Sequence, residues 1–273
     1  MMVLLALLGC APAASTPSPE PAPAPENVVV GSKALVAAAD GLELQVVTWT
    51  AGPAHGVGWL ASVPRNGVLT VAPGAGVHPL AELVGEPSPP WAAINGGFYE
   101  DGPMGLVVSN GVESHPVATN GGSGVVQSGP SGVSIVHRDA WSPGPTEALQ
   151  SIDRLVDGGA SLVHARPDAH RDARSAVAIS EDRLWLVAAF ADNNVTAGPD
   201  GIQLVNTVGN GMTLAEFAQF LVSGLGAKQA LNLDGAVSTQ MIVATPTWRW
   251  VVRGERGTIN GVVLRPPRPA VAK

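Results

Sequence analysis

Turn-forming residues divide this chain into short segments, and no other feature restricts its fold as strongly. The sequence has 33 glycines and 24 prolines among 273 residues, and Gly-Pro or Pro-Gly pairs recur from residue 52 to residue 199. Because both residues interrupt helices and strands, a bundle of long helices is excluded and many short strands are expected. The apolar runs between the turns have the length of strands and cover residues 44–48, 105–108, 133–136, 176–179, 184–189, 230–233, 240–243 and 261–264.

Two helices are predicted among these strands. Thr213 and Glu216 form a capping-box pair, and Gly226 suits the left-handed position at the end of a helix. The side chains at helical spacing between them are Leu214, Phe217, Leu221, Val222 and Leu225. A weaker helix is predicted over residues 146–156, with Leu149, Ile152 and Val156 on one side. The apolar runs are often continuous, which suits strands covered on both faces. The predicted class is therefore α+β, a mixed β-sheet core of many short strands with few helices.

The first residues are typical of a targeting segment. Residues 3–8 form an apolar run of six that ends in Gly9 and Cys10, far short of the roughly 20 residues that a membrane-spanning helix needs. Residues 7–10 resemble a bacterial lipobox, in which the signal is cut before a cysteine that then carries a lipid. The alternative is a chance cysteine inside an ordinary secretory signal. We predict a signal peptide over residues 1–10, with Cys10 as the lipidation site.

The organisation predicted for the rest of the chain follows from where the prolines gather. Residues 11–27 hold six prolines, nearly all at alternate positions, which favours a semi-rigid polyproline spacer. Residues 28–265 show no repeat and no second linker, so we predict one domain, followed by a tail over residues 266–273. Together with the lipid on Cys10, these features predict an extracytoplasmic lipoprotein tethered to the membrane of a bacterial cell envelope.

Composition excludes several classes of partner and site. The chain has 15 Lys and Arg against 22 Asp and Glu, a formal net charge of -7, and no cluster of basic residues. Such a charge distribution argues against nucleic acid as a partner. Hydrophobic residues make up 45% of the chain and charged residues 14%, whereas disordered sequences are poor in hydrophobic residues and rich in charge. One cysteine excludes a disulfide framework and any cysteine-rich zinc site.

Three segments carry residue types suited to chemistry. Asp234 and Gly235 follow an apolar strand, which places a carboxylate at the strand's end, although Asp-Gly is also a common plain turn. The segment from Asn95 through two glycines to Tyr99 could let a ligand approach the backbone, and its alternative reading is a hairpin turn followed by core aromatics. Arg174 precedes an apolar strand, where a guanidinium suits a phosphate or carboxylate; the alternative is an ordinary surface arginine.

In this order and spacing, these segments and four others resemble the phosphodiester glycosidase family. The resemblance covers about residues 91–264, while residues 28–90 match loosely. The matching motifs are N-G-G-F-Y at 95–99, P-M-G-L-V-V-S-N-G at 103–111, G-G-A-S-L-V at 158–163, A-R-S-A at 173–176, T-L-A-E-F-A at 213–218, N-L-D-G-A-V-S-T at 232–239 and E-R at 255–256.

The resemblance implies a hydrolase that cleaves the bond between a sugar anomeric carbon and phosphate, as in removal of N-acetylglucosamine from a phosphodiester to mannose. For this reaction we expect three catalytic residues: Asp234 as nucleophile or base on the anomeric side, Arg174 on the phosphate, and Asn95, which would hold sugar hydroxyls or phosphate oxygens. The implied substrate-binding residues are Gly96, Gly97, Tyr99, Gly235, Ser238 and Thr239. Glycosidases commonly use a second carboxylate, and its candidates are Glu100, Asp101, Asp157 and Glu255.

The expected substrate is a sugar phosphate or polysaccharide. No cofactor is predicted. A divalent metal is not excluded, because His164, Asp168, His170 and Asp172 are possible ligands, but their spacing matches no zinc motif and favours a solvated loop. The sequence departs from the family at Ala236 and Val237, where the family has glycine. A left-handed backbone there would not suit Val237. The alternative function is therefore a non-catalytic glycan-binding lipoprotein with the same fold.

Overall fold

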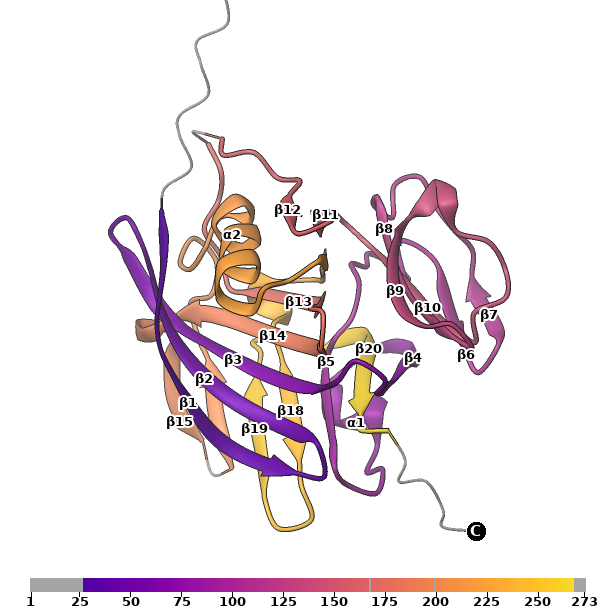
Figure 1. The fold of residues 1–273 in the computed structure, drawn as a ribbon, viewed down its shortest axis with the longest axis horizontal. Helices are drawn as coiled ribbons and strands as arrows, with labels where there is room; N and C mark the ends of the chain where they lie inside the picture. Colours follow the sequence, from indigo (N-terminus) through magenta and orange to yellow (C-terminus); the bar gives the residue numbers. More distant parts are fainter. Residues whose placement is uncertain (1–26, 167, 199, 268–273) are drawn as a thin grey trace, which may run out of the picture.

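A computed structural model describes residues 27–166, 168–198 and 200–267 of the chain (Figure 1). The predicted signal peptide with Cys10 lies outside the described residues, as does the predicted tether apart from Asn27. Of the predicted tail, Pro266 and Pro267 are described. Neither of the helices in the described part combines the length and the apolar character needed to cross a membrane.

The largest sheet runs through the middle of the molecule and has eight strands, all paired antiparallel. In spatial order they are β1 (Val28–Ala39), β2 (Leu42–Ala51), β3 (Ala54–Pro64), β14 (Arg183–Ala191), β13 (Arg174–Ile179), β17 (Gln229–Asn232), β11 (Arg154–Asp157) and β12 (Ala160–Ser161). Strands from the N-terminal third and from the C-terminal half of the chain therefore share this sheet.

Two further sheets pack beside it. The seven-stranded sheet has the order β15 (Val195–Gly198), β16 (Gly201–Leu204), β19 (Arg249–Arg253), β18 (Met241–Ala244), β5 (Trp91–Asn95), β20 (Thr258–Arg265) and β4 (Val68–His78). The five-stranded sheet, on the right in Figure 1, has the order β7 (Val112–His115), β6 (Val107–Ser109), β10 (Glu147–Ser151), β8 (Gly124–Gly129) and β9 (Gly132–His137). The pairing of β16 with β19 is parallel.

Helical structure is confined to short elements. The two α-helices are α1 (Leu80–Val84) and α2 (Leu214–Leu225), and the 3-10 turns cover Arg138–Ala140, Asp192–Asn194 and Ala236–Ser238. The described part of the chain is thus mainly β, with many short strands and few helices. The prediction of an α+β class agrees with this architecture in its β-sheet core, whereas helices contribute less than the class name suggests.

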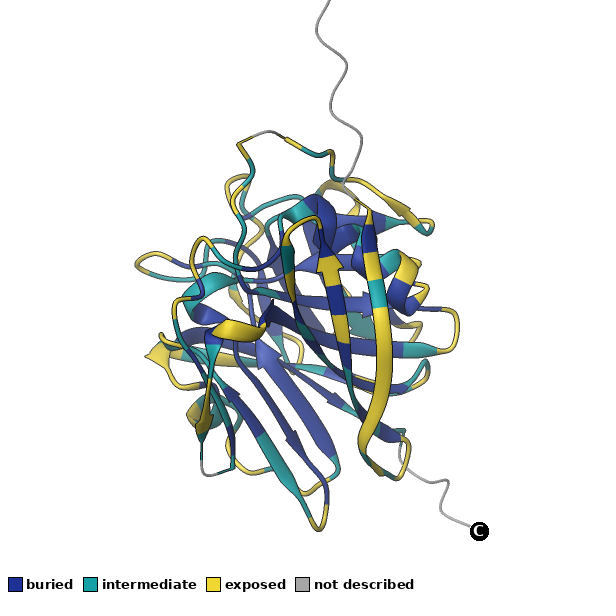
Figure 2. Ribbon diagram, turned by 90° about the vertical axis from the view of Figure 1, so that its left-hand side faces the viewer, coloured by how far each residue is buried: buried dark blue, intermediate teal, exposed yellow. Residues whose placement is uncertain are grey.

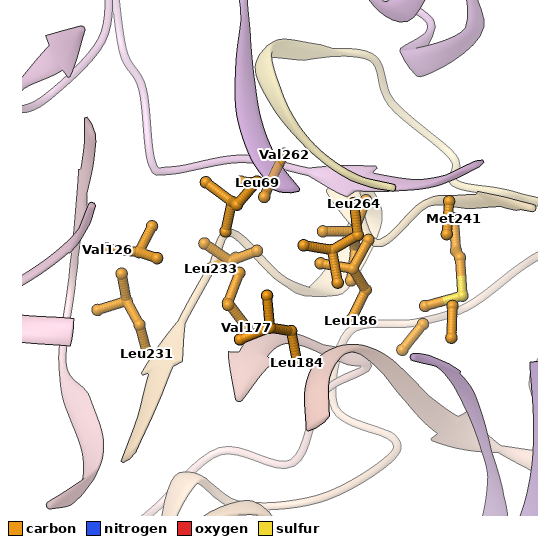
Figure 3. Close-up of a cluster of buried hydrophobic side chains, with 14 of the residues drawn as sticks. Leu69, Val126, Val177, Leu184, Leu186, Leu231, Leu233, Met241, Val262 and Leu264 are labelled. Atoms are coloured by element: carbon orange, nitrogen blue, oxygen red, sulfur yellow. The ribbon is translucent and has the colours of Figure 1, made fainter. Parts of the chain in front are cut away.

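The main hydrophobic core lies where the three sheets meet (Figure 3). Leu186 comes from the eight-stranded sheet, Val126 from the five-stranded sheet and Val262 from the seven-stranded sheet, and all three are fully buried. Leu233, directly before Asp234, lies in the same cluster. Figure 2 shows the inner strands buried along most of their length, with exposed residues on turns and outer strands. The core thereby fixes the segment from which Asp234 emerges.

The opposite face of the eight-stranded sheet is covered by α2. Phe217, Phe220 and Leu221 are fully buried and pack against residues such as Trp49 and Val187. Because both faces of β13 and β14 are covered, their sequences are continuously apolar, as predicted. The predicted capping box is also confirmed. The Thr213 hydroxyl accepts from the Glu216 amide at 3.2 Å, the Glu216 carboxylate accepts from the Thr213 amide at 2.8 Å, and Gly226 has a φ of 64°.

The helix predicted over residues 146–156 is wrong. This segment forms β10 and β11, separated by a turn in which Asp153 has a φ of 64°. Leu149 pairs with Val126 and Val107, so the side chains that fit a helical spacing belong instead to a central strand. Pairing with strands distant in the sequence outweighs the local pattern here.

Candidate active site

Asn95 joins three segments that are far apart in the sequence. It is the last residue of β5 and is fully buried. Its Oδ1 accepts from the Ser175 hydroxyl at 2.8 Å and from the Gln240 amide at 3.0 Å, and its Nδ2 donates to the Asp234 carbonyl at 2.5 Å. Every one of these partners is a protein group, so the side-chain amide holds the Asp234 backbone in place.

The two glycines after Asn95 pack against neighbouring strands. The Gly96 amide donates to the Asn260 carbonyl and the Gly97 amide to Asn260 Oδ1, both at 2.8 Å, while the Gly96 carbonyl accepts from the Asp234 amide at 3.0 Å. A Cβ on Gly96 would lie 1.8 Å from Asn260 Oδ1, and one on Gly97 would lie 2.6 Å from the Gln150 carbonyl. The close approach that requires glycine is therefore an approach to the protein itself.

Asp234 is half-buried, and two protein groups hydrogen-bond to its carboxylate. Its Oδ1 accepts from the Gly235 amide at 2.9 Å, and the Ser238 side chain also hydrogen-bonds to it. Burial raises the pKa of Asp234 above the ordinary range, while the Ser238 hydrogen bond, the Gly235 amide and the charge of Arg256 act in the opposite direction. A carboxyl group with a pKa raised in this way is suited to acid-base or nucleophilic chemistry.

The cation that acts on Asp234 is Arg256, which the sequence analysis did not select. Its guanidinium carbon lies 4.8 Å from the centroid of the Tyr99 ring, and the Tyr99 hydroxyl donates to the Gly257 carbonyl at 2.8 Å. Tyr99 is 9% exposed. The Glu255-Arg256 pair in the family motif was the signal that could have identified this arginine.

The backbone around Arg174 lies beside the turn that holds Asp234, but the Arg174 guanidinium hydrogen-bonds to other groups. The carbonyls of its neighbours Ala173 and Ser175 accept from the amides of Ala236 and Leu233, each at 2.8 Å. Its Nε and Nη2 donate to the carbonyls of Met212 and His170, both at 2.8 Å, and Nη2 lies 3.4 Å from the Asp172 carboxylate. Burial lowers the pKa of Arg174, and Asp172 and Glu216 oppose that shift. The charges that act on Arg174 thus do not include Asp234.

Arg174 lines a cavity of about 820 Å³ at the junction of the five-stranded sheet, β11 and α2. Asp153 and Arg154 line it from the start of β11. The remaining polar lining comes from Ser123, His137, His164, Arg166, Asp168, His170 and Asp172. Residues 162–166 and 168–171 have no helix or strand, in agreement with the predicted loop. Within the described ranges, no three His, Cys, Asp or Glu residues are placed to hold a metal ion.

The four candidate second carboxylates are spread over the surface. Glu100 and Asp101 are exposed in the loop after Tyr99. Asp157 lies 3.2 Å from Arg154, in an ion pair. Glu255 accepts from the amide and hydroxyl of Thr207, at 2.9 and 2.5 Å, and these hydrogen bonds lower its pKa.

The turn after Asp234 shows which departure from the family motif affects the backbone. Ala236 has a φ of 49°, in the left-handed region that favours glycine, and begins a 3-10 turn that contains Val237 and Ser238. The left-handed backbone that was expected at Val237 therefore occurs at Ala236. A Cβ on Gly235 would lie 2.8 Å from the Ala173 carbonyl. Ser238 and Thr239 are buried, and Thr239 Oγ1 has no hydrogen-bond partner among the described residues.

Gln150 is a further buried residue that supports this region. Its Oε1 accepts from the amides of Leu106 and Ala118, both at 3.0 Å, and its Nε2 donates to the carbonyls of Ala118 and Gly122, at 2.6 and 2.8 Å. The side chain is fully satisfied, which fixes Leu106 and the loop between β7 and β8 against β10.

Comparison with known proteins gives a family and two related folds. The sequence profile of the phosphodiester glycosidase family matches residues 90–265. A hypothetical protein from Synechocystis superposes with a TM-score of 0.59 at 17% identity, covering 85% of this chain and 64% of that one. This chain thus spans less than two thirds of the Synechocystis protein.

The second structure is the catalytic domain of zebrafish N-acetylglucosamine-1-phosphodiester alpha-N-acetylglucosaminidase, auto-inhibited by its pro-peptide. It superposes with a TM-score of 0.54 at 16% identity, covering 90% of this chain and 85% of that one. None of the curated proteins matches the sequence at a significant level. The two superpositions show a shared fold, and the profile covers well over half of the sequence. The chain belongs to the phosphodiester glycosidase family.

Proposed function

We propose that this protein hydrolyses the bond between a sugar anomeric carbon and a phosphodiester oxygen. The observation that carries the proposal is the hydrogen bonding of Asn95 to Ser175, Gln240 and the Asp234 carbonyl, which fixes the backbone of the half-buried Asp234 where three motif segments meet. In the reaction, the anomeric C–O bond breaks and the phosphate leaves with the electron pair. Water supplies the hydroxyl of the free sugar, and its proton passes to the released phosphate.

Each candidate residue has a distinct role in this proposal. Asp234 faces the anomeric carbon as nucleophile or base and stabilises the positive charge that develops on the sugar. Phosphate is a good leaving group, so the main requirement on its side is a cation. Arg256, whose charge acts on Asp234, supplies that cation, because the Arg174 guanidinium is held by the carbonyls of Met212 and His170. Asn95 is assigned to positioning the Asp234 backbone, because protein groups occupy its hydrogen bonds.

The test is release of free sugar from a sugar-1-phosphodiester, measured together with binding of the same compound. We expect wild-type protein to bind and release sugar, and Asp234→Asn to bind without release while unfolding at an unchanged or higher temperature. Asp101→Asn, in an exposed loop, is the matched control for loss of one carboxylate. Turnover by Asp234→Asn at the wild-type rate would contradict the assignment.

A non-catalytic glycan-binding lipoprotein is the second candidate, and Ala236 favours it. The family has glycine where this chain holds alanine at a φ of 49°, so the turn beside the carboxylate is strained. Binding of the phosphodiester by wild-type protein without any sugar release would support this candidate. Recovery of release in Ala236→Gly would then identify the strained turn as the cause.

We also propose that the protein is tethered to a bacterial membrane by a lipid on Cys10. The support is the short apolar run before Cys10 and the proline-rich segment after it. Labelling of expressing cells with a radioactive fatty acid should mark the wild-type protein. Cys10→Ala should lose the label and move from the membrane fraction to the soluble fraction, and retention of label would contradict the proposal.

A further inference from the structure

Arg256 lies in a loop that hydrogen bonds hold from two sides. Its amide donates to the Val237 carbonyl at 2.9 Å, in the turn after Asp234. Its carbonyl accepts from Gln240 Nε2, also at 2.9 Å. A Cβ on Gly254 would lie 2.8 Å from the Val237 carbonyl, so the loop and the turn are in direct contact. These contacts tie the Arg256 backbone to the segment that follows Asp234.

Gln240 connects this loop to the residue that holds Asp234. Its amide donates to Asn95 Oδ1 at 3.0 Å, and its carbonyl accepts from the Asn95 amide at 3.2 Å. Its Oε1 accepts from the Leu80 amide at 3.2 Å, which leaves Nε2 facing the Arg256 carbonyl. Gln240 is buried, so water does not replace these partners. Gln240 therefore hydrogen-bonds through its backbone to Asn95 and through its side chain to the Arg256 loop.

The position of this loop determines where the Arg256 guanidinium lies. Arg256 is exposed, so packing does not fix its side chain on all sides. The guanidinium carbon lies 4.8 Å from the centroid of the Tyr99 ring, and the Tyr99 hydroxyl donates to the Gly257 carbonyl at 2.8 Å. An aromatic ring attracts a cation that lies over its face within about 6 Å of its centre. A shift of the loop would therefore move the guanidinium off the ring.

We propose that Gln240 is a positioning residue, whose side chain sets where the Arg256 guanidinium lies relative to the turn after Asp234. Gln240 touches no reacting atom and acts through the Arg256 carbonyl. Its catalytic importance rests on the proposed function, in which Arg256 acts on the departing phosphate. When the side chain is replaced, the Arg256 carbonyl loses its donor and the loop can move. The Gln240 backbone is unchanged, so Asn95 still holds the Asp234 backbone.

Tyr99 gives a direct readout of this position, because it is the only tyrosine in the chain. Full-length protein labelled with 3-fluorotyrosine should therefore show one fluorine NMR signal when folded. Arg256→Gln removes the cation from the ring and should shift this signal. Gln240→Met keeps the length of the side chain but removes its polar atoms. It should shift the signal toward the position seen in Arg256→Gln.

Gln229→Met is the matched control for this measurement. Gln229 lies at the other end of β17 from Asp234 and hydrogen-bonds to Ile135 on both sides of its amide, so the variant should keep the wild-type signal. Gln240→Glu keeps an acceptor for the amide bonded there and lacks the donor, so it serves as a second variant if Gln240→Met does not fold. A folded Gln240 variant with the wild-type signal would overturn the proposal, as would an unchanged signal in Arg256→Gln.

Sugar release separates a positioning role from a merely structural one. If the proposed function holds, Gln240→Met should lower kcat/KM for a sugar-1-phosphodiester by about 10- to 100-fold, because a small misplacement of a catalytic group has this effect. In an Arg256→Gln background the same change should have no further effect, since Gln240 acts through Arg256. Equal losses in the two backgrounds would overturn the proposal. A fluorine signal that shifts as expected in a protein that releases no sugar would contradict the proposed catalysis and leave the placement of Arg256 by Gln240 standing.

Discussion

Replacing Asn95 with alanine should lower the free energy of unfolding by more than a substitution at the surface would. The variant leaves the Gln240 amide without its acceptor and the Asp234 carbonyl without its donor. The Ser175 hydroxyl also loses its acceptor, but it can rotate toward another one. A buried polar group left without a partner costs about 1–3 kcal/mol. Counting the two backbone groups, we expect a loss of about 4 kcal/mol in the free energy of unfolding.

Urea unfolding followed by circular dichroism measures this loss. With a slope of about 2–3 kcal/mol per molar urea, the midpoint should fall by roughly 1 to 2 M. Asn66→Ala, at an exposed turn between β3 and β4, is the control and should change the free energy by less than about 0.5 kcal/mol. A loss below about 1 kcal/mol in Asn95→Ala would refute the view that this side chain holds the three segments together.

Three other variants test separate features. Burial raises the pKa of Asp234 in the folded state, so stability contributed by its protonated form is lost as pH rises from about 3.9 through the raised pKa. The stability of Asp234→Asn relative to wild type, measured by urea unfolding, should therefore be higher at pH 7 than at pH 3. The same stability difference at the two pH values would contradict this. Thr213→Ala removes the acceptor for the Glu216 amide and should cost about 1 kcal/mol by thermal unfolding; no change would mean that the cap contributes nothing. Ala236→Gly should gain about 0.5 kcal/mol, because relief of the left-handed strain exceeds the added chain entropy, and a clear loss of stability would refute the strain.

Local signals made α2 predictable from the sequence. Thr213, Glu216 and Gly226 act within one helix, so their effect does not depend on the rest of the fold. The segment over residues 146–156 was not predictable in the same way. Its apolar spacing fits a helix, but Leu149 pairs with Val107 and Val126, and such pairing between distant strands leaves little trace in a local pattern.

The candidate site was likewise predictable only in part. The segments at Asn95, Arg174 and Asp234 could be selected because they match a family motif, and their backbones do meet. Which way each side chain points could not be predicted, because it follows from long-range contacts. The Arg174 guanidinium is held by the carbonyls of Met212 and His170. The Arg256 guanidinium packs on the Tyr99 ring, and its charge acts on Asp234.

The junction at Asn95 also determines how the protein would respond to heating. Asn95 belongs to the seven-stranded sheet, whereas Ser175 and Asp234 belong to the eight-stranded sheet or follow it directly. The backbone hydrogen bonds of each sheet join strands within that sheet, so a small movement of one sheet relative to the other would not break them. A small relative displacement of the sheets would therefore separate Asn95 from Asp234 while leaving both sheets intact. Thermal inactivation should precede melting of the β-structure, and the interval between the two temperatures would measure how firmly the sheets are joined.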